Sequence, residues 1–451
     1  MMIKLLHNKR GEISFTSERA LPLLRDTLRN AADFPTYAAL FRRAKVSKKT
    51  AQADTETAFS RVPPIVKSDF AALQRDSFQR VQNREFANDW TSGSTASPIL
   101  RIASPADEAA EAEAVSRAFR SVGISPQDRV VFFDVGASDI YLFYARVLHA
   151  LGVFGSCFVK AGSDRKISAR DVARFKPTII ISVPSVIGNC LHYLAEEKKA
   201  QFDWSIRHLI YISEPISPWV ASEARRTLGA TCLSFYGTTE VGSVGIECVC
   251  SGGIHIPLDL FCPTLLPYQG HDVRLVSKDA YEGPIAWTSL KFRDHPVVKF
   301  CVGDLVRITL GGCACGNPAP TMHFLMRLNH AISLFGIKFS YNLFLEEIEH
   351  SIGLPINLEI RVLLGTAGPS RDKPAQLCFV IEQRYRQFLN RCRATVLAIH
   401  PLDDFVERKL LEIRFQLVSS SYFHQRKTRR LIVRLNSEDS RSAKTNPQET
   451  S

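Results

Sequence analysis

The chain has 451 residues, of which 45% are hydrophobic and 23% are charged, and its formal net charge is +12. This length and composition predict a soluble globular protein of two or three domains. No window approaches about 18 uninterrupted apolar residues, so we expect no membrane span. The N-terminus has no long apolar stretch, so no secretory signal is expected. The eleven cysteines are spread along the chain, which favours a reducing cytoplasm over a disulfide framework.

Part of the positive charge gathers near the C-terminus. The basic residues there are Arg426, Lys427, Arg429, Arg430, Arg434, Arg441 and Lys444. Such a segment suits a polyanionic small ligand, an acidic carrier protein or nucleic acid, and it is also typical of a solvated basic face. No RNA-binding aromatic motif, zinc-finger spacing or basic heptad accompanies it, so we expect no nucleic-acid partner.

The first segment that points to chemistry runs from Trp90 to Pro98, because all residues between these two are Ser, Thr, Gly or Ala. Backbone N–H groups and hydroxyls in such a run can approach an anion, since no large side chain intervenes. The segment therefore suggests a phosphate-binding loop for a nucleotide, with an ordinary turn as the alternative. It differs from the P-loop of the common NTPases, which has a Lys directly after its last Gly.

Helical and strand patterns alternate along much of the chain. Residues 17–45 have helical periodicity that is broken at Phe34-Pro35, and Ala106–Val122 predicts a second helix. Short apolar runs, each followed by turn residues and a helical pattern, predict strands over Arg129–Val135, Thr178–Val183, His208–Ser213 and Cys232–Tyr236. Apolar strands that alternate with helices predict a parallel sheet covered on both faces, with ligands at the carboxyl ends of its strands.

The pattern changes from about residue 328. Expected strands are Ala331–Ile337, Glu359–Leu364, Ala375–Glu382, Leu411–Val418 and Leu431–Leu435, and the expected helix is Tyr341–Ile352. We therefore predict an α/β fold with a large N-terminal lobe, residues 1–327, of mostly parallel sheets and flanking helices. A small, mobile α+β C-terminal domain is expected over residues 328–435, and the Ser-, Thr- and charge-rich tail, residues 436–451, is predicted to be disordered.

Several short motifs follow one another in an order that is typical of a known superfamily. The Ser/Thr loop precedes Glu214-Pro215-Ile216-Ser217-Pro218, then Tyr236-Gly237-Thr238-Thr239-Glu240, then Gly303-Asp304. In this order they resemble the adenylate-forming superfamily. A narrower resemblance, to its phenylacetate–CoA ligase branch, depends on Glu247-Cys248, Gly253-Ile254-His255-Ile256-Pro257, Gly303-Asp304-Leu305-Val306-Arg307 and Cys313-Ala314-Cys315-Gly316. The resemblance covers roughly residues 20 to 435.

The resemblance implies that a carboxylate attacks the α-phosphate of ATP and gives an acyl-AMP and pyrophosphate. Charge then gathers on phosphate and carboxylate oxygens, where hydrogen-bond donors and a metal cation must meet it. The implied nucleotide-binding residues are Thr91, Ser92, Gly93, Ser94, Thr95, Glu214, Tyr236, Gly237, Thr238, Asp304 and Arg327. Among them, Tyr236 would lie against the adenine and Asp304 would accept from both ribose hydroxyls. Glu240 would hold Mg²⁺, and Thr239 beside it would contact the α-phosphate.

The expected substrate is a small-molecule carboxylic acid, aromatic or hydrophobic, which would lie between the strand ends. Residues expected to line its pocket are Phe133, Tyr141, Pro184, Ser213 and Phe235, although the same residues also suit an ordinary core. The expected acceptor is coenzyme A, with a carrier-protein thiol or an amine as alternatives. The oligomeric state stays open, a homodimer included.

Two motifs depart from the family pattern, which has Gly-Arg-x-Asp at the domain hinge and an adenylation Lys after a Gly near the C-terminus. Here the hinge reads Met326-Arg327-Leu328-Asn329, and Arg426 precedes Lys427. By the resemblance, Lys427 is the residue that neutralises the developing charge, with one more surface lysine as the alternative. The departures keep a second class of function open, namely a binding or scaffold protein that retained the fold and lost turnover.

Three cysteines and a histidine form a second group. Cys248 and His255 are spaced Cys-x6-His, and Cys313 and Cys315 are spaced Cys-x-Cys. Three thiolates and one imidazole make a closed tetrahedral zinc site. Because members of the branch resemble the chain at these positions, we predict a structural Zn²⁺ that joins the loop after Tyr-Gly-Thr-Thr-Glu to the loop after Gly-Asp. Cys250 competes with Cys248 as a ligand, and Cys-x-Cys also occurs in turns that bind no metal.

Overall fold

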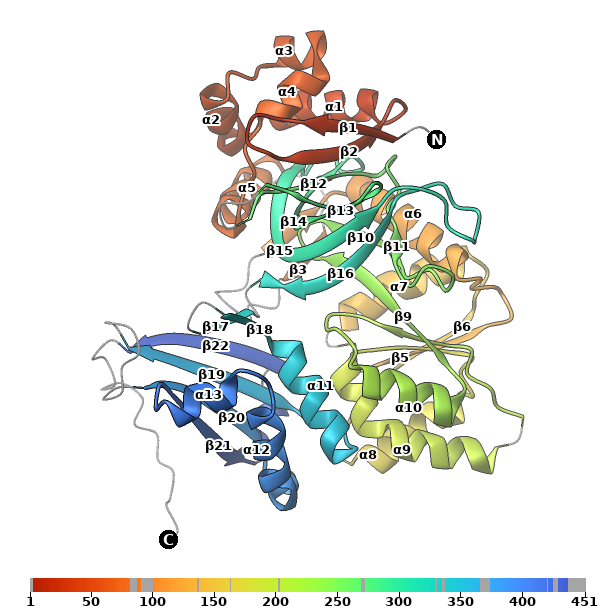
Figure 1. The fold of residues 1–451 in the computed structure, drawn as a ribbon. Coiled ribbons are helices and arrows are strands. Elements are labelled where there is room, and N and C mark those ends of the chain that lie inside the picture. Colours follow the sequence, from red (N-terminus) through yellow and green to blue (C-terminus); the bar gives the residue numbers. More distant parts are fainter. Residues whose placement is uncertain are drawn as a thin grey trace. The chain divides into compact units, whose positions relative to one another are not determined.

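A computed structural model describes residues 3–81, 87–90, 100–135, 138–162, 164–201, 203–268, 272–328, 331–334, 337–365, 374–419, 421–424 and 429–436. The chain divides into two units (Figure 1). The first contains Met1–Ile216 and Ala221–Leu328, and the second contains Ser217–Val220 and Asn329–Ser451. Within the described ranges, no helix has both the length and the apolar character that a membrane crossing requires.

One sheet of the first unit has six strands in the order β10-β9-β8-β7-β5-β6. These strands are β5 (Arg129–Phe133), β6 (Gly155–Val159), β7 (Ile179–Ser182), β8 (His208–Tyr211), β9 (Thr231–Thr238) and β10 (Gly242–Ile246). All neighbours are parallel except β9 and β10, which form an antiparallel hairpin. The four predicted apolar runs form β5, β7, β8 and β9, because such runs suit a sheet that is buried on both faces.

Helices cover both faces of this sheet (Figure 1). The helices are α6 (Pro105–Ser121), α7 (Ser138–Ala150), α8 (Arg165–Arg174), α9 (Pro184–Ala200) and α10 (Pro218–Leu228). The connection from β5 to β6 runs in one direction along the sheet, and the connections from β6 to β7, β8 and β9 run in the other. Since parallel crossovers are right-handed, α7 lies on one face and α8 to α10 lie on the opposite face. The predicted helix Ala106–Val122 is α6, whose N-cap is Ser104.

The larger sheet of the first unit has eight strands in the order β1-β2-β12-β14-β15-β16-β11, with β13 paired to β14. Its strands are β1 (Ile3–His7), β2 (Ile13–Ser17), β11 (Ile254–His255), β12 (Phe261–Leu265), β13 (Arg274–Ser277), β14 (Ala280–Ser289), β15 (Val297–Thr309) and β16 (Thr321–Arg327). Every pair in it is antiparallel. The α/β class is therefore confirmed, but the expectation of mostly parallel sheets holds only for the smaller sheet. Strands β14 and β15 are joined by the short segment 290–296, which is too short for a parallel crossover.

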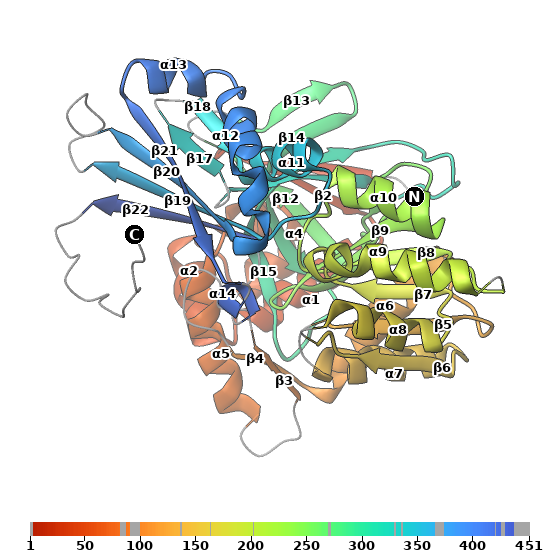
Figure 2. The ribbon, with the colours of Figure 1, turned by 90° about the horizontal axis from the view of Figure 1, so that it is seen from below.

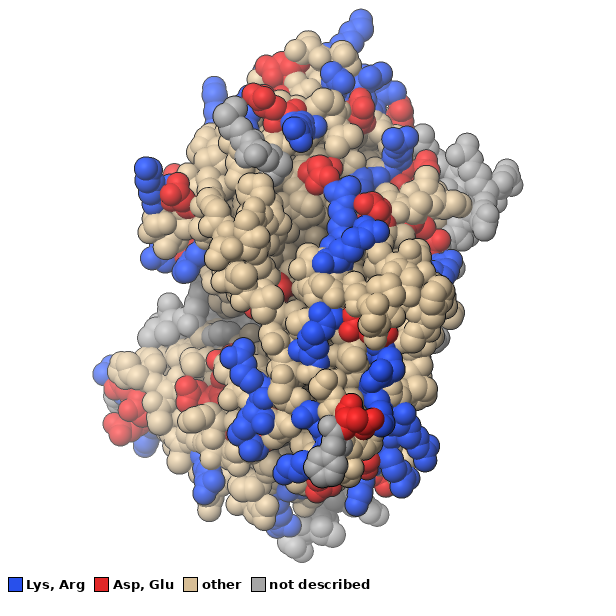
Figure 3. All heavy atoms as spheres, turned by 90° about the vertical axis from the view of Figure 1, so that its right-hand side faces the viewer, with Lys and Arg blue, Asp and Glu red and all other residues tan. Residues whose placement is uncertain are grey.

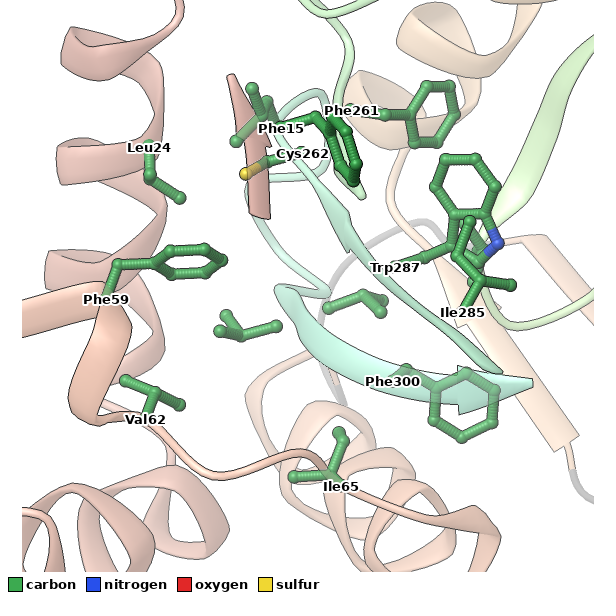
Figure 4. Packing of buried hydrophobic residues seen from close by; sticks show 14 of the residues in the cluster. Phe15, Leu24, Phe59, Val62, Ile65, Phe261, Cys262, Ile285, Trp287 and Phe300 are labelled. Atoms are coloured by element: carbon green, nitrogen blue, oxygen red, sulfur yellow. The ribbon is translucent and has the colours of Figure 1, made fainter. Parts of the chain in front are cut away.

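Five helices from the start of the chain pack on this larger sheet. They are α1 (Leu21–Ala31), α2 (Pro35–Arg43), α3 (Lys48–Ala53), α4 (Thr55–Arg61) and α5 (Lys67–Val81). The predicted run 17–45 divides into α1 and α2 at Phe34-Pro35, because proline ends one helix and begins the next. Figure 4 shows Leu24 and Phe59 from these helices beside Cys262, Trp287 and Phe300 from the strands, in a core that holds the sheet in place. A separate hairpin joins β3 (Ala87–Trp90) to β4 (Leu100–Ala103).

The second unit contains a four-stranded sheet in the order β21-β20-β19-β22 (Figure 2). Its strands are β19 (Leu358–Gly365), β20 (Ala375–Glu382), β21 (Leu411–Val418) and β22 (Arg429–Asn436), and a hairpin is formed by β17 (Ala331–Leu334) and β18 (Ile337–Ser340). The helices are α11 (Tyr341–Ile352), η2 (Gln383–Phe388), α12 (Leu389–Leu397), α13 (Leu402–Glu407) and α14 (Ser421–His424). The sheet packs through Phe379 against Phe344 of α11, with ring centroids 5.4 Å apart. The predicted tail lies outside the described residues after Asn436.

Candidate active site

A cavity of about 620 Å³ lies in the first unit at the carboxyl ends of β8 and β9. Its lining comes from β4, α6, α7, the loop after β8 and the β9–β10 hairpin. Parallel α/β sheets bind their ligands at this edge, because the loops that follow the strands converge there. The cavity therefore lies where an α/β sheet would bind the predicted nucleotide and acid.

One wall of the cavity is apolar and comes mainly from α7. Its lining side chains are Ile140, Leu142, Phe143, Tyr144, Ile212 and Phe235. The Tyr144 ring stacks on Phe132 with centroids 6.0 Å apart and an interplanar angle of 9°, and it lies 5.6 Å from the Phe235 ring. This packing fixes the orientation of the two rings, so the wall can receive a flat apolar group with little rearrangement.

The opposite wall is polar and is organised by Glu111 of α6. Its carboxylate accepts hydrogen bonds from the backbone N–H of Ser243 at 2.7 Å and from the ammonium of Lys291 at 2.5 Å. Burial by itself raises the pKa of Glu111, but the charges of Lys291 and Arg101 and the hydrogen bonds from Lys291 and Ser243 together hold that pKa below its ordinary value. Gly242 has φ of +83° and a Cβ there would overlap the Glu111 carboxylate, so the hairpin reaches this position only with glycine.

The predicted acid-pocket residues do not all lie at this cavity. Ser213 and Phe235 line it, whereas Phe133, Tyr141 and Pro184 do not. Side chains alternate along a strand, so Phe133 points away from the face of β5 where Phe132 meets α7, and it is fully buried. Tyr141 turns toward β5 and β6 and packs on Phe132 and Phe158. Pro184 is the first residue of α9.

The Tyr-Gly-Thr-Thr-Glu motif spans the end of β9 and the turn into β10. Gly237, Thr238 and Thr239 line the cavity, and the Thr238 hydroxyl accepts from the backbone N–H of Val241 at 3.2 Å, which closes the turn. Glu240 follows in the same turn and is half-buried. The hairpin thus brings a backbone amide, two hydroxyls and a carboxylate to one edge of the sheet, a donor set that suits phosphate and a divalent cation.

Tyr236 is directed toward Asp304 on β15. The Tyr236 hydroxyl donates to Oδ2 of Asp304 at 2.7 Å, and the indole N–H of Trp287 donates to the same hydroxyl at 3.4 Å. Arg327, which is opposite Asp304 in the β15–β16 register, places its Nε 3.2 Å from Oδ1 without the alignment of a hydrogen bond. Oδ1 is therefore a buried acceptor that no described donor satisfies. The Tyr236 hydroxyl is therefore bonded to Asp304, so in the predicted contact with adenine only the ring of Tyr236 would take part.

Asp304 is 3% exposed, and the groups around it shift its pKa in opposite directions. Burial raises the pKa of the Asp304 carboxyl above its ordinary value, and the nearby Glu240 adds to this increase. The Arg327 guanidinium and the Tyr236 hydroxyl oppose it, because both stabilise the carboxylate. The same environment raises the pKa of Tyr236 well above its ordinary value, mainly through burial and then through the Asp304 charge. The pair is thus arranged so that tyrosine donates and aspartate accepts.

Several predicted site residues cannot be placed relative to the cavity. Thr91, Ser92, Gly93, Ser94, Thr95 and Lys427 lie outside the described residues. Glu214 is described, in the loop after β8, where its backbone N–H donates to the carbonyl of Ile212 at 2.8 Å. It does not line the cavity, although its neighbour Ser213 does.

The predicted cysteine–histidine group is assembled in the structure. The candidate ligand atoms of Cys248, His255, Cys313 and Cys315 all lie within 4.8 Å of one another. Sγ of Cys248 is 3.8 Å from Sγ of Cys313, and Sγ of Cys315 is 3.3 Å from Nε2 of His255. A tetrahedral ion with Zn–S bonds of about 2.3 Å separates two sulfurs by about 3.8 Å and a sulfur from a nitrogen by about 3.6 Å. The donor set and spacing therefore fit zinc, and Cys248 rather than Cys250 belongs to the group.

The surroundings of this group favour metal ligation. Burial opposes ionisation of the Cys248 thiol, but the backbone N–H groups of Cys250 and Ser251, together with the side chains of His255 and Ser251, lower the pKa of that thiol to about 6. Nδ1 of His255 lies 3.4 Å from the carbonyl oxygen of Ala319, which leaves Nε2 for the ion. Gly253 approaches Thr321 and His323 so closely that a Cβ would collide with both, which explains the glycine beside the cluster.

Sequence reasoning missed the residues of α6 and α7 that line the cavity. The helical period offered a signal on α7, because Phe143 and Tyr144 follow Ile140 by three and four residues. On α6, Asp107 and Glu111 share the apolar face with Val115, which is an unusual place for two carboxylates. No local sequence pattern predicted that Arg101 lines the cavity, because this depends on which elements pack against β4.

Several known proteins are similar to this chain. The family model described as AMP-binding enzyme matches residues 89–276, which include the Ser/Thr loop and the β9–β10 hairpin. This match confirms the resemblance to the adenylate-forming enzymes. A phenylacetate-coenzyme A ligase from Escherichia coli is 26% identical over 268 residues, and one from Pseudomonas putida is 25% identical over 226 residues. The aligned parts cover 58% and 49% of this chain, and they span only 59% and 50% of these relatives.

Solved structures show the same fold over more of the chain. A 2-hydroxyisobutyryl-CoA ligase in a postadenylation state has a TM-score of 0.68, covers 92% of this chain and is 18% identical, with 89% of its own chain covered. ATP-bound MatB from Rhodopseudomonas palustris has a TM-score of 0.51 over 75% of this chain and 67% of its own, at 16% identity. At these identities the likeness establishes the fold alone, which this chain shares with these solved structures.

Proposed function

We propose that this protein uses ATP to activate a hydrophobic, aromatic carboxylic acid as an acyl-AMP, releases pyrophosphate, and transfers the acyl group to coenzyme A. The observation that carries this proposal is a shared cavity. Gly237, Thr238 and Thr239 line the same space as the rings of Tyr144 and Phe235. An acid on the aromatic wall would have its carboxylate next to a phosphate held by the hairpin, so the two reactants would be oriented before they react.

The names of the relatives support this reaction class. The curated relatives are phenylacetate-coenzyme A ligases, and a 2-hydroxyisobutyryl-CoA ligase with the same fold was solved in complex with 2-HIB-AMP and CoA. The aromatic preference rests on the wall formed by α7, whose exposed face toward the cavity is made of rings and aliphatic chains. A wall of this kind favours a flat apolar acid through the area that it buries.

The nucleotide is proposed to lie with its ribose at Asp304. A carboxylate accepts well from a diol, and Oδ1 of Asp304 is a buried acceptor without a described donor. Tyr236 and Arg327 would hold the carboxylate in position, since each contacts one of its oxygens. Thr239 would donate to the α-phosphate, on which charge increases as the acid carboxylate attacks.

Magnesium is proposed at Glu240, in the turn directly after Thr239. Carboxylate, hydroxyl and phosphate oxygens are the hard ligands that Mg²⁺ prefers, so the donors present in this turn fit the ion. When bound there, Mg²⁺ would neutralise charge on the phosphates. Glu240 would then orient the triphosphate relative to Thr238 and Thr239, which line the cavity.

A structural Zn²⁺ is proposed at Cys248, His255, Cys313 and Cys315. Three sulfurs and one nitrogen complete a tetrahedral shell and leave no open position for a substrate. Cys248 directly follows the β10 region, and Cys313 and Cys315 lie between β15 and β16. The ion would therefore join the loop beyond the Thr-Thr-Glu turn to the strand pair that carries Asp304 and Arg327.

Lys427 is proposed as the cation that meets the developing charge during adenylation, as the family resemblance implies. Coenzyme A is proposed as the acceptor, with a carrier-protein thiol or an amine as the alternatives. Basic and acidic side chains both occur on the face in Figure 3, so the charge of this face does not separate these acceptors. A cytoplasmic location is proposed from the eleven cysteines, all of which are free. A homodimer is a further proposal that light scattering can test.

The proposal is tested by pyrophosphate release with ATP, Mg²⁺ and a panel of aryl and alkyl acids, with and without coenzyme A. We expect release with an aryl acid and formation of its thioester. Lys427→Ala should retain ATP binding and lose adenylation, whereas Lys444→Ala, in the predicted tail, should behave like the wild type. ATP binding without pyrophosphate release from any acid would instead favour a scaffold that kept the fold.

A further inference from the structure

Four charged side chains line the cavity, and three of them have counter-charges in the protein. Glu108 lies 3.6 Å from Arg146, and Glu111 is paired with the buried Lys291. Arg101 is the fourth. Its guanidinium forms no ion pair or hydrogen bond with any side chain that the structure describes, a set that does not include Asp89, which is opposite Arg101 in the β3–β4 register. Among the side chains that the structure describes at the cavity, Arg101 is therefore the cation whose donors are left for a ligand.

The position of Arg101 is nevertheless fixed. It lies on β4, which is held in the β3–β4 hairpin, and its guanidinium lies over the buried Phe292 ring with 5.0 Å to the centroid. The positive charge of Arg101 acts to lower the pKa of two nearby carboxyl groups, those of Asp107 and Glu111. Both carboxylates accept hydrogen bonds from other groups. Asp107 accepts from the backbone N–H groups of Arg293 and Asp294. Glu111 accepts from the Lys291 ammonium and from the backbone N–H of Ser243. An arginine that is stacked on a ring, and that no described side chain pairs, is organised for an external anion.

Polyphosphate is the anion that the surroundings favour. The guanidinium fork matches two oxygens of a phosphate, and Arg101 shares its cavity with the amide and hydroxyls of Gly237, Thr238 and Thr239. It also lies only three residues after Pro98, at the end of the Ser/Thr segment. On α7, Arg146 already faces Glu108 at 3.6 Å and the other lining side chains are mainly apolar, so the polar side of the cavity is where the anion fits.

We propose that Arg101 binds the β- and γ-phosphates of ATP and stabilises the pyrophosphate as it leaves. This inference rests on the proposed function. In the step concerned, a carboxylate oxygen forms a bond to the α-phosphorus while the bond from that phosphorus to the bridging oxygen breaks. The electron pair of the broken bond stays on the pyrophosphate, and Arg101 neutralises part of the charge that it carries away. Arg101 itself exchanges no proton.

Calorimetric titration of the full chain with ATP, AMP and pyrophosphate, each with Mg²⁺ and without acid, tests the assignment. In Arg101→Gln we expect ATP and pyrophosphate affinities to fall about 10- to 100-fold, the range for loss of a charge-assisted hydrogen bond. AMP affinity should stay within about twofold, because AMP lacks both groups. Arg101→Lys should lie between wild type and Arg101→Gln. Arg120→Gln, at the exposed end of α6, is the matched control and should bind all three ligands normally.

Three outcomes would overturn the assignment. The first is an equal loss of AMP and ATP affinity in Arg101→Gln, and the second is no loss of affinity for either nucleotide. The third is unchanged ATP affinity with a raised KM only for acids that have a second carboxylate, which would place that carboxylate at Arg101. Thermal unfolding of Arg101→Lys and Arg101→Gln separates a folding defect from a binding defect. A wild type that binds ATP through Arg101 but releases no pyrophosphate with any acid would overturn the ligase function and leave the Arg101 assignment intact.

Discussion

The buried pair of Glu111 and Lys291 supports the polar wall of the cavity, and its removal gives the most quantitative prediction. The two side chains are 9% and 1% exposed and their charged atoms are 2.5 Å apart. Replacing Glu111 by Leu leaves the Lys291 ammonium buried without its counter-ion and the Ser243 N–H without its acceptor. Breaking a buried pair from one side costs about 3–5 kcal/mol of unfolding free energy. We therefore expect Glu111→Leu to be among the most destabilising single changes on α6.

Thermal unfolding converts this free energy into a measurable shift. The first unit has roughly 320 residues, and an unfolding entropy of about 2 cal/mol/K per residue gives about 0.7 kcal/mol per degree. Glu111→Leu should therefore lower the Tm of this unit by about 4–7 °C. Glu113→Gln is the matched control, because Glu113 is on the same helix and pairs with Arg117 but is 51% exposed. A surface pair of this kind contributes about 0–1 kcal/mol, so its Tm should fall by about 1 °C or less.

The double variant Glu111→Leu with Lys291→Met provides the decisive comparison. If the two charges stabilise each other, removing both should cost clearly less than the sum of the single losses, because no unpaired charge remains. Additive losses in the double variant, or a Glu111→Leu shift no larger than that of Glu113→Gln, would refute the reasoning. Either result would mean that Lys291 finds water or another partner when Glu111 is absent.

Three further predictions concern the nucleotide site, the hairpin and the metal. Because burial raises the pKa of Asp304, ATP binding should weaken as the pH falls through that raised value. Tyr236→Phe removes a hydrogen bond that lowers the pKa of Asp304, so ATP binding should begin to weaken at a higher pH in this variant. Superimposable pH profiles of ATP affinity in the wild type and Tyr236→Phe would contradict this. Gly242→Ala should cost about 1–3 kcal/mol, since φ is positive and the Cβ overlaps Glu111, whereas Gly162→Ala should unfold like the wild type in the same melting experiment. Elemental analysis should find about one zinc per chain, lost in His255→Ala and kept in Cys250→Ser; equal zinc in both variants would argue against the site.

Local sequence patterns were sufficient for the four-stranded sheet and α11 of the second unit, but they did not predict η2, α12, α13 and α14, and the predicted strand Ala331–Ile337 is divided between β17 and β18. The predicted bounds of α11, β20 and β21 coincide with those in the structure, because each is a run with one clear period and clear breakers at its ends. The larger sheet of the first unit was not predicted as antiparallel. Its order joins β2 to β12 and β11 to β16, and pairings between strands so far apart in sequence leave no local signal.

The sequence by itself determined which chemistry the chain offers. Residue type and spacing were enough to select Gly237 to Thr239, Asp304 and the Cys248–His255 and Cys313–Cys315 pairs, because phosphate and metal binding demand particular donors in short motifs. Only the tertiary structure decided that Arg101 shares a cavity with the β9–β10 hairpin, that Phe133 turns away from this cavity, and that Glu111 meets Lys291. These facts depend on which buried surfaces meet across the fold, and contacts of that kind are set by packing between distant segments.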